Sequence, residues 1–455
     1  MSRKPIIALA LGVALVVIGV LIVVLWPEDP SFQVKTSWLG ERPSGPVRLC
    51  GSEDVTKARR RAVKDYNDKY FPGSTMATYS EGSFLADEEH DRYVRSVEEG
   101  SDDCDVILLD VVYMKEFAAN HLLYDMTPYL DQHDRRADFD SDMLQTVEHE
   151  GRPWGVPKEL DVGVLYYRAD QVRPPRSWQD VYEQSKPGPS HDLPGLRVQV
   201  GPYEGLTVIL LELAYAAGAD PIITDDGKTA EIDQPHVREA LKFLHDAFRE
   251  RAIPQVPQID TSNLEQYALG RARFLRGWPF VAAEIRNAEG GSEGKPSTPR
   301  AQRARRVTAA NTTIVRLPPW TPGGDSVSVL GGRNLVVPRS APHPSAALHL
   351  IDFMTSQEQV RQDVKEGSQL SVRKDLAEEF GFGNRDLLKA VSETNVMQRP
   401  SIPQYADVST IISCGVSNII QGPAGIAIRE RLQDIERDVQ SVLDGGSADL
   451  KSRAC

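Results

Sequence analysis

The sequence predicts an α/β protein of more than one domain, preceded by one membrane-spanning helix. Three observations lead to this prediction. The chain opens with an apolar run from Ile6 to Trp26, strand-like and helix-like segments then alternate over residues 47–109, and a similar alternation recurs over residues 162–354. In addition, the length of 455 residues exceeds that of one ordinary domain.

The apolar run has about the length needed to cross a bilayer, roughly 20 residues. Arg3 and Lys4 precede it, which favours an N-terminus on the inside. It ends in Leu25-Trp26-Pro27-Glu28 without the small-residue pattern of a cleavage site, and no cysteine is near for lipid attachment. Residues 1–27 are therefore predicted to be an uncleaved single-pass signal anchor in the cell membrane, with the bulk of the chain extracytoplasmic. A cleaved signal peptide is the alternative.

Residues 28–45 contain Pro and Ser and are predicted to be a linker off the membrane. Strand, helix, strand, helix and strand then follow in order, which is the signature of a doubly wound parallel sheet. The predicted strands are 47–50, 76–79 and 105–109, and the predicted helices are 55–70 and 90–99. The last strand is apolar throughout, as expected of a strand buried on both faces.

The second half alternates in the same way. Strands are predicted at 162–167 and 335–337, and helices at 205–217, 236–250, 344–354, 409–420 and 426–443. Residues 289–306 differ, because Gly, Ser and Pro accompany five basic residues there. They are predicted to form an exposed, mobile loop. Contact with a polyanion or with anionic lipid is the alternative.

The composition excludes several classes of protein. The net charge of −13 argues against nucleic acid as a partner, which needs a basic face. Cys50, Cys104, Cys414 and Cys455 lack metal-ligand spacing, so no metal site or cofactor is expected. Cys50 ends one predicted strand and Cys104 precedes a parallel one, which makes a disulfide between them doubtful and favours buried thiols.

Nothing in the sequence marks an enzyme. No H-E-x-x-H pattern, P-loop or Ser/His/Asp arrangement stands out. Carboxylates are plentiful, but none is marked as the general acid partnered with a nucleophile that a glycosidase needs. No enzymatic activity is therefore predicted.

Eight groups of segments, in order over residues 45–445, resemble the extracellular solute-binding proteins of ABC importers, in the maltose- and trehalose-binding group of family 1. They are Asp105–Asp110 with Glu116–Ala119; Gly151–Pro157 with Asp161–Arg168; Pro175–Trp178; Tyr203–Leu206; Phe274–Pro279; Leu330–Val337 with His343–Ser356; Gly367–Arg373; and Pro403–Tyr405.

The resemblance implies a two-lobed, periplasmic-binding-protein-like fold with three interlobe crossings. Lobe I would comprise residues 46–160 and 331–397, lobe II residues 161–330 and 398–445, and a tail residues 446–455. The implied function is capture of a small polar ligand, with an oligosaccharide as the expected class, by lobe closure for an ABC importer. The implied partners are the ligand, the permease subunits and the membrane. A membrane-anchored ligand sensor that signals to a partner protein is the alternative.

Sugars require charged or amide groups at their hydroxyl edges and aromatic planes against their faces. Such residues stand at predicted strand ends and crossings, where open α/β sheets bind ligands. The predicted ligand-binding residues are Glu81, Asp110, Tyr113, Asp161, Tyr203, Glu204, Trp278, Gly331, Gly332 and Arg373. The structural alternatives are helix caps for Asp110 and Glu204, a hinge role for Asp161, core packing for Tyr113 and Trp278, turns for the two glycines, and a surface ion pair for Arg373.

The sequence departs from the family pattern in ways that affect the ligand. Lys158-Glu159 stands where small or aromatic residues are commoner in the family, and Ser371 replaces the usual Pro. A cleft more charged than that of a typical sugar binder is therefore expected. An amino-sugar, a charged sugar or another ligand class stays open.

Overall fold

The computed structural model of the protein describes residues 32–446, apart from residues 41–42, 44, 100–103, 189–191, 257–258, 291–297, 368 and 378–384. The predicted anchor at 1–27 lies outside the described residues. Within them, no helix has both the length and the apolar character that a bilayer crossing needs. Residues 34–40 of the predicted linker belong to the folded part of the chain, where the 3-10 helix η2 (Thr36–Gly40) packs against α13 (Pro344–Met354).

Lobe I is built on a mixed sheet in which parallel strands neighbour antiparallel ones. The strand order is β12-β11-β3-β1-β2, and β6 pairs with β11. The strands are β1 (Val47–Gly51), β2 (Ala77–Glu81), β3 (Val106–Asp110), β6 (Val156–Val162), β11 (Val327–Val336) and β12 (Asn395–Met397). As predicted, the first three strands are parallel. Residues 106–109 of β3 are fully buried, because a central strand covered on both faces needs apolar residues throughout.

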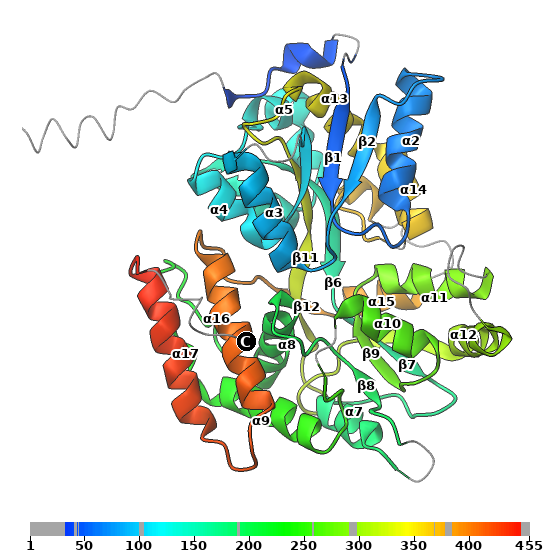
Figure 1. Cartoon of the computed structure of the whole chain (residues 1–455), viewed down its shortest axis with the longest axis vertical. Helices are drawn as coiled ribbons and strands as arrows, with labels where there is room; N and C mark the ends of the chain where they lie inside the picture. Colours follow the sequence, from blue (N-terminus) through cyan, green and yellow to red (C-terminus); the bar gives the residue numbers. More distant parts are fainter. Residues whose placement is uncertain are drawn as a thin grey trace, which may run out of the picture. The chain divides into compact units, whose positions relative to one another are not determined.

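The helices of lobe I flank this sheet (Figure 1). They are α2 (Ala58–Tyr70), α3 (Ala86–Glu99), α4 (Met114–Ala119), α5 (Thr127–Asp131), α6 (Ser141–Val147), α13 and α14 (Gln357–Gly367), with the 3-10 helices η3 (Val111–Tyr113), η4 (Gln132–Asp138) and η5 (Lys374–Leu376). A short hairpin of β4 (Glu148–His149) and β5 (Arg152–Pro153) precedes β6.

Lobe II has its own sheet, in the order β10-β7-β9-β8. Its strands are β7 (Val164–Arg168), β8 (Leu196–Arg197), β9 (Phe274–Gly277) and β10 (Thr312–Arg316). Its helices are α7 (Trp178–Ser185), α8 (Glu204–Ala217), α9 (Pro235–Arg249), α10 (Asp260–Ala268), α11 (Phe280–Gly290), α12 (Pro299–Asn311), α16 (Tyr405–Ile420) and α17 (Ile428–Leu443). α15 (Arg385–Ser392), which the predicted boundaries assign to lobe I, packs against β10.

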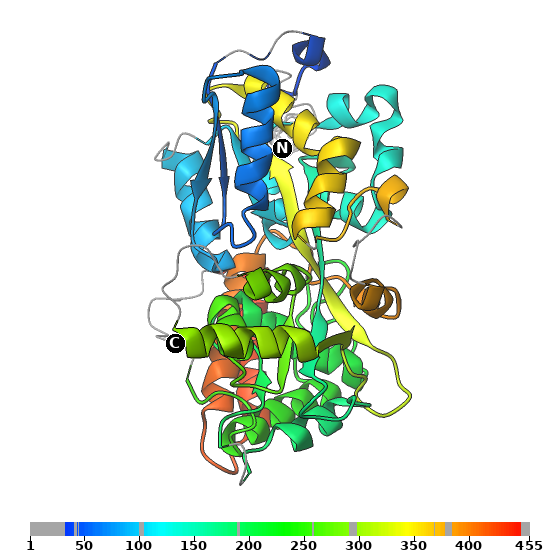
Figure 2. The ribbon, with the colours of Figure 1, turned by 90° about the vertical axis from the view of Figure 1, so that its right-hand side faces the viewer.

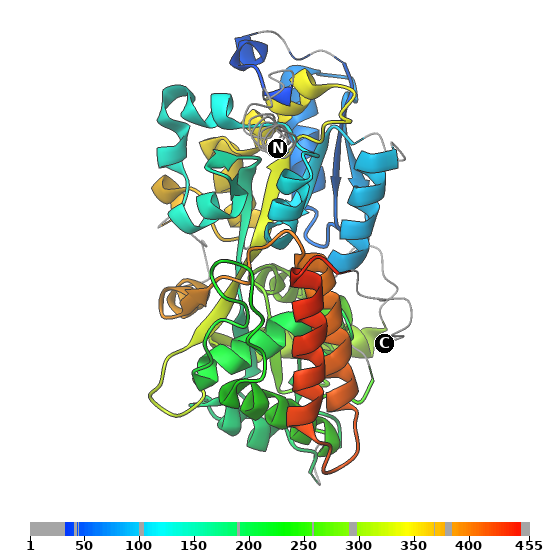
Figure 3. The same ribbon diagram turned by 90° about the vertical axis from the view of Figure 1, so that its left-hand side faces the viewer.

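The packing of helix α8 explains why its sequence is apolar on every side. The helix packs against α9, α16 and β11, so little of its surface meets water. Figure 3 shows α16 and α17 side by side in this helical layer of lobe II. The N-terminus of α8 lies at the pocket described below, which makes this buried helix a fixed support for the site.

Three segments connect the lobes. β6 leaves the lobe I sheet and continues after Gly163 into β7 of lobe II. β11 pairs with β12, then with β6 and finally with β3, so that one long strand returns to lobe I (Figure 2). The chain after β12 passes to α16 in lobe II. Strands rather than loose loops thus form two of the three crossings.

The prediction that favoured buried thiols over a Cys50–Cys104 disulfide is wrong. The two residues form a disulfide with their Cα atoms 5.8 Å apart, and both side chains are buried. The sequence argument placed Cys50 and Cys104 at opposite ends of the sheet. Instead, Asp105 bonds twice to Arg48 of β1, through its backbone N–H and its carboxylate, and so brings the entry to β3 alongside β1.

The expectation of a loop over residues 289–306 is also wrong for the residues that the structure describes. Residues up to 290 complete α11, and α12 begins at Pro299. The Thr298 hydroxyl accepts a hydrogen bond from the Ala301 N–H, and Pro299 occupies the first turn, where its missing N–H costs nothing. Buried Thr308 accepts from the Arg168 guanidinium and fixes the helix on lobe II.

Candidate ligand-binding site

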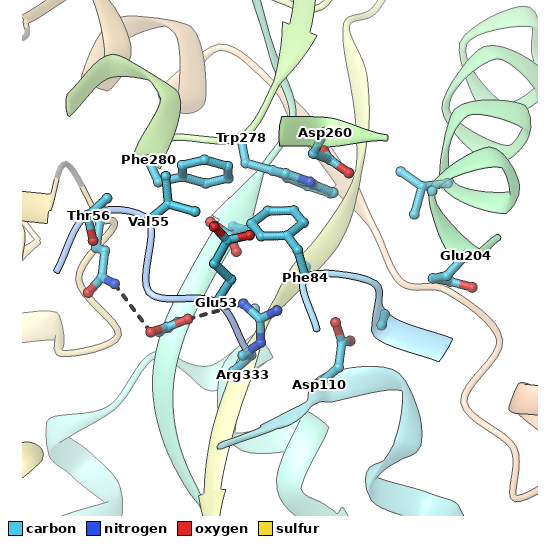
Figure 4. Close-up of a pocket in the computed structure, with 18 of the residues that line it drawn as sticks. Glu53, Val55, Thr56, Phe84, Asp110, Glu204, Asp260, Trp278, Phe280 and Arg333 are labelled. Carbon is cyan, nitrogen blue, oxygen red and sulfur yellow. Dashed lines mark hydrogen bonds and ion pairs between the residues drawn. The ribbon is translucent and has the colours of Figure 1, made fainter. Parts of the chain in front are cut away.

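A pocket lies where the two lobes and their crossings meet (Figure 4). Lobe I contributes the loop after β1, the loop before α3 and the end of β3. Lobe II contributes the N-termini of α8 and α10 and the segment after β9. The lining residues include Glu53, Asp54, Thr56, Arg59, Phe84, Asp110, Glu159, Asp161, Tyr203, Glu204, Asp260, Trp278, Phe280, Gly331, Gly332, Arg333, Gln369 and Arg399.

The lobe I wall is organised around a buried ion cluster. Arg59 donates to both oxygens of Glu159, with Nε–Oε1 and Nη2–Oε2 distances of 2.9 and 2.8 Å. The Arg333 guanidinium lies 3.5 Å from the same Glu159 carboxylate and 3.3 Å from the carboxylate of Glu89. Burial acts to raise the pKa of Glu159, but the Arg59 and Arg333 guanidinium groups outweigh it and lower that pKa to about 2. Glu159 is therefore a fixed negative charge.

The neighbouring lysine has a different role. Successive residues of a strand face opposite sides, so Lys158 points away from the pocket. Its Nζ lies 2.5 Å from the Asp363 carboxylate and donates to the Met354 carbonyl at 2.8 Å, inside lobe I. The unusual Lys158-Glu159 pair therefore adds one buried structural ion pair and one pocket carboxylate.

The lobe II wall carries three aromatic side chains beside the carboxylates of Glu204 and Asp260. Tyr203, Trp278 and Phe280 contribute to it, and Figure 4 shows Trp278 and Phe280 on the side opposite Arg333 and Asp110. The Arg276 guanidinium lies 3.8 Å from the centroid of the Trp278 ring and supports it from behind. This wall offers rigid apolar planes against which the C–H face of a ring can pack.

Arg399 links the two walls at the third crossing. Its Nη1 donates to Glu204 at 2.5 Å, and its Nη2 lies 3.3 Å from Asp110 of lobe I. Tyr405 and Ser409 of α16 also donate to the Glu204 carboxylate. Glu204 thus enters the pocket with its carboxylate already hydrogen-bonded within lobe II.

Asp161 is placed differently from these paired carboxylates. It lines the pocket at the end of β6, and in the described part of the chain its carboxylate has no hydrogen-bond or ion-pair partner. Burial, together with the nearby negative charge of Glu159, raises its pKa to about 7. A group so placed is ready to accept a hydrogen bond from a ligand.

A second contact between the lobes lies beside the pocket. Asp87 of α3 accepts from the backbone N–H of Glu204, at 3.2 Å for its nearer oxygen, and from the Tyr113 hydroxyl at 3.3 Å. Glu204 is the first residue of α8, so a lobe I carboxylate caps the N-terminus of a lobe II helix. This contact exists only while the lobes lie together.

The structure brings together seven of the ten predicted ligand-binding residues. These are Asp110, Asp161, Tyr203, Glu204, Trp278, Gly331 and Gly332, all of which line the pocket. Asp110 also caps η3, because its carboxylate accepts from the Val112 N–H at 3.2 Å. Glu204 accepts no capping bond from its own helix.

The two glycines serve close packing within the pocket wall. At Gly332, φ is +131° and an added Cβ would lie 2.0 Å from the Glu159 carbonyl oxygen, so only glycine fits between β11 and β6. At Gly331, a Cβ would meet the Trp278 ring at 3.3 Å and the Asp161 Cβ at 3.2 Å. Gly331 therefore makes room for the Trp278 ring.

The other three predicted residues lie outside the pocket lining. Tyr113 is buried against His90, with ring centroids 4.5 Å apart. Arg373 pairs with Asp138 and Asp375 at 3.2 and 3.0 Å. Glu81 pairs with Arg60 and accepts from the Asp54 N–H at 2.7 Å.

Several lining residues escaped the sequence argument. Arg333 and Gln369 lie within the quoted segments Leu330–Val337 and Gly367–Arg373 but were not singled out there. Arg399 had one available signal, since it follows the predicted third crossing at 397. Only the fold identifies Arg59, Phe84, Asp260 and Phe280, because residues distant in sequence become neighbours there.

This fold and this pocket define a class of protein that closes two α/β lobes around a small molecule. Residues 86–361 match the family described as bacterial extracellular solute-binding protein, and the chain belongs to that family. The described residues contain no group of three or more His, Cys, Asp or Glu side chains arranged to hold a metal ion.

Individual relatives agree with this assignment. A "probable ABC transporter-binding protein" of Deinococcus radiodurans is 27% identical over 343 residues, which cover 70% of this chain and 75% of that protein. Maltose-bound MalE3 of T. maritima has a TM-score of 0.74 at 24% identity and covers 88% of this chain and 100% of that one. The GacH receptor of Streptomyces glaucescens, solved without ligand and with acarbose, has a TM-score of 0.71 at 19% identity over 89% of this chain and 100% of that one.

Proposed function

We propose that the protein captures a sugar or oligosaccharide between its lobes and delivers it to the permease of an ABC importer. One observation carries the proposal. A single pocket combines hydrogen-bonding carboxylates and arginines from lobe I with the aromatic wall of lobe II. Hydroxyl edges pair with the former and C–H faces pack on the latter. The solved relatives bound to maltose and to acarbose support this ligand class.

Lobe closure about the crossings would trap the ligand. The Asp87 bond to the α8 N-terminus and the Phe84–Phe280 contact, with ring centroids 5.9 Å apart, join the lobes beside the pocket. A ligand that contacts both walls favours the closed arrangement by its differential affinity for that state. The closed form would then be the one that docks on the permease.

We also propose that residues 1–27 anchor the protein to the cell membrane, with the lobes extracytoplasmic. The family is extracellular, and the Cys50–Cys104 disulfide fits an oxidising compartment. The described relatives are binding or transport proteins, so the sensor alternative is not taken further. We propose no catalytic activity.

Isothermal titration of the full chain against mono-, di- and trisaccharides tests the ligand class. We expect at least one sugar to bind and to reduce the radius of gyration measured by small-angle scattering. Binding without compaction would contradict the closure mechanism. The absence of binding to every sugar would overturn the proposed ligand class.

A further inference from the structure

The pocket contains more negative than positive charge. Seven acidic and three basic residues line it, which leaves a formal excess of four negative charges. A neutral sugar needs hydrogen-bond partners but does not need such an excess. The partners of each charged group therefore indicate which ligand the site suits.

All three arginines of the lining are already paired with carboxylates of the protein. Arg59 bonds both oxygens of Glu159. Arg399 bonds Glu204 and approaches Asp110, and Arg333 lies between Glu89 and Glu159. An anionic ligand would have to compete for these cations, so the site is unsuited to a uronate or a phosphorylated sugar.

Four of the lining carboxylates form no ion pair within the part of the chain that the structure describes. Asp54 accepts from the backbone N–H groups of Arg59 and Arg60 at the start of α2. Asp161 has no partner in the described part of the chain, and the exposed carboxylate of Glu53 also has none there. Among the described residues, Asp260 accepts from neutral donors only, the Tyr203 hydroxyl at 2.8 Å and the Gln199 amide. The uncompensated negative charge of the pocket is therefore located at these positions.

Asp161 also lies beside the aromatic wall. The Asp161 Cβ and the edge of the Trp278 ring both flank Gly331, at 3.2 and 3.3 Å from the position of its missing Cβ. A carboxylate next to an indole suits a protonated amine, because the first supplies charge and hydrogen bonding and the second attracts a cation through its ring. A hydroxyl supplies the hydrogen bond but leaves the half-buried charge uncompensated.

We propose that the ligand is an amino-sugar or another polyhydroxylated amine, with its ammonium group held by Asp161 beside Trp278. The proposal rests on the proposed sugar-binding function and narrows it to a cationic subclass. It assigns Asp161 as the residue that distinguishes an aminated ligand from its neutral parent.

Matched ligands test the proposal on the unaltered protein. Titration of the full chain near neutral pH would compare trehalose and maltose with their 2-, 3- and 6-amino-deoxy derivatives and with the N-acetylated forms. We expect at least one amine to bind at least tenfold more tightly than its parent, and N-acetylation of that amine to remove the gain.

Binding of the parents with no amine favoured would overturn this proposal and leave the proposed function standing. No binding of any member would overturn both for these sugars. Tighter binding of a uronic acid derivative than of its parent would also overturn the cationic assignment.

The variant Asp161→Asn locates the effect. We expect the preference for the amine over its parent sugar to fall below threefold, whichever way the affinity for the parent sugar itself changes. Asp142→Asn, on an exposed position of α6, is the matched control and should keep the full preference. An unchanged preference in Asp161→Asn would overturn the assigned role, and thermal unfolding would establish that the variant is folded. Should it not fold, the wild-type ligand comparison alone decides the proposal.

Discussion

The two walls of the pocket hold their side chains in different ways. On the lobe I side, charged groups fix one another, as Arg59 and Arg333 do around Glu159. On the lobe II side, Trp278 is placed by packing between Arg276 and the gap at Gly331. A charged wall is rigid only while every charge has its partner, whereas an aromatic wall depends on shape. Substitutions on lobe I should therefore affect stability first, and those on lobe II affinity first.

The largest effect is expected from Glu159→Gln. This substitution leaves Arg59 buried without its carboxylate, which should lower the free energy of unfolding by about 3–5 kcal/mol. Urea denaturation measures this. Asp68→Asn, which breaks the exposed Lys64–Asp68 pair, is the control and should change the midpoint little. Similar midpoints for the two variants would show that the cluster is not a structural support.

A smaller effect, on affinity, is expected from Trp278→Ala. Loss of the indole plane should weaken binding of the best ligand by about 10- to 100-fold, corresponding to roughly 1.4–2.8 kcal/mol. Titration calorimetry measures it. Trp320→Phe is the control, since Trp320 packs against Phe243 away from the pocket lining. Equal affinities for wild type and Trp278→Ala would show that the aromatic wall does not contribute to ligand binding.

Asp161, on the β6 crossing between the lobes, predicts that ligand affinity depends on pH. With a pKa of about 7, Asp161 is mostly protonated at about pH 6 and mostly ionised at about pH 8. Glu159, Asp110, Arg333 and Arg59 are the charged groups that influence it. A ligand whose amine stays protonated over this interval binds the ionised form, so its affinity should rise roughly tenfold. Titrations at both values measure the change. Asp161→Asn should remove the contribution of Asp161 and leave that of Asp87, whose pKa burial also raises to about 7.

The smallest effect is expected at the contact between the lobes. Asp87→Ala removes the cap that lobe I places on α8, and a lost cap costs about 1 kcal/mol. Since closure is coupled to binding, affinity should fall about fivefold. Asp91→Ala, on an exposed position of the same helix, should leave it unchanged. Equal affinities for both variants would show that the cap does not contribute to closure.

The regular elements followed closely from sequence patterns. The predicted helix at 344–354 coincides with α13, and the apolar run at 105–109 with β3. The loop prediction was wrong for residues 298–306, because Gly, Ser, Pro and basic residues were taken as signs of a loop, whereas Thr298 and Pro299 are the start signals of α12. The disulfide was missed because a one-dimensional pattern does not show how residues 104–105 approach β1.

The sequence by itself determined the order of strands and helices, the apolar cores and seven candidate residues that do line the pocket, because periodicity and strand-end position are local properties. Only the tertiary structure decided which charges are paired. Arg59 and Glu159 stand 100 residues apart, and Arg399 and Asp110 289 residues apart. The energy of a charge depends on its neighbours in space. Glu159 is paired, and Asp161, two positions on in the same strand, has no partner among the residues that the structure describes; this distinction emerges only when the chain has folded.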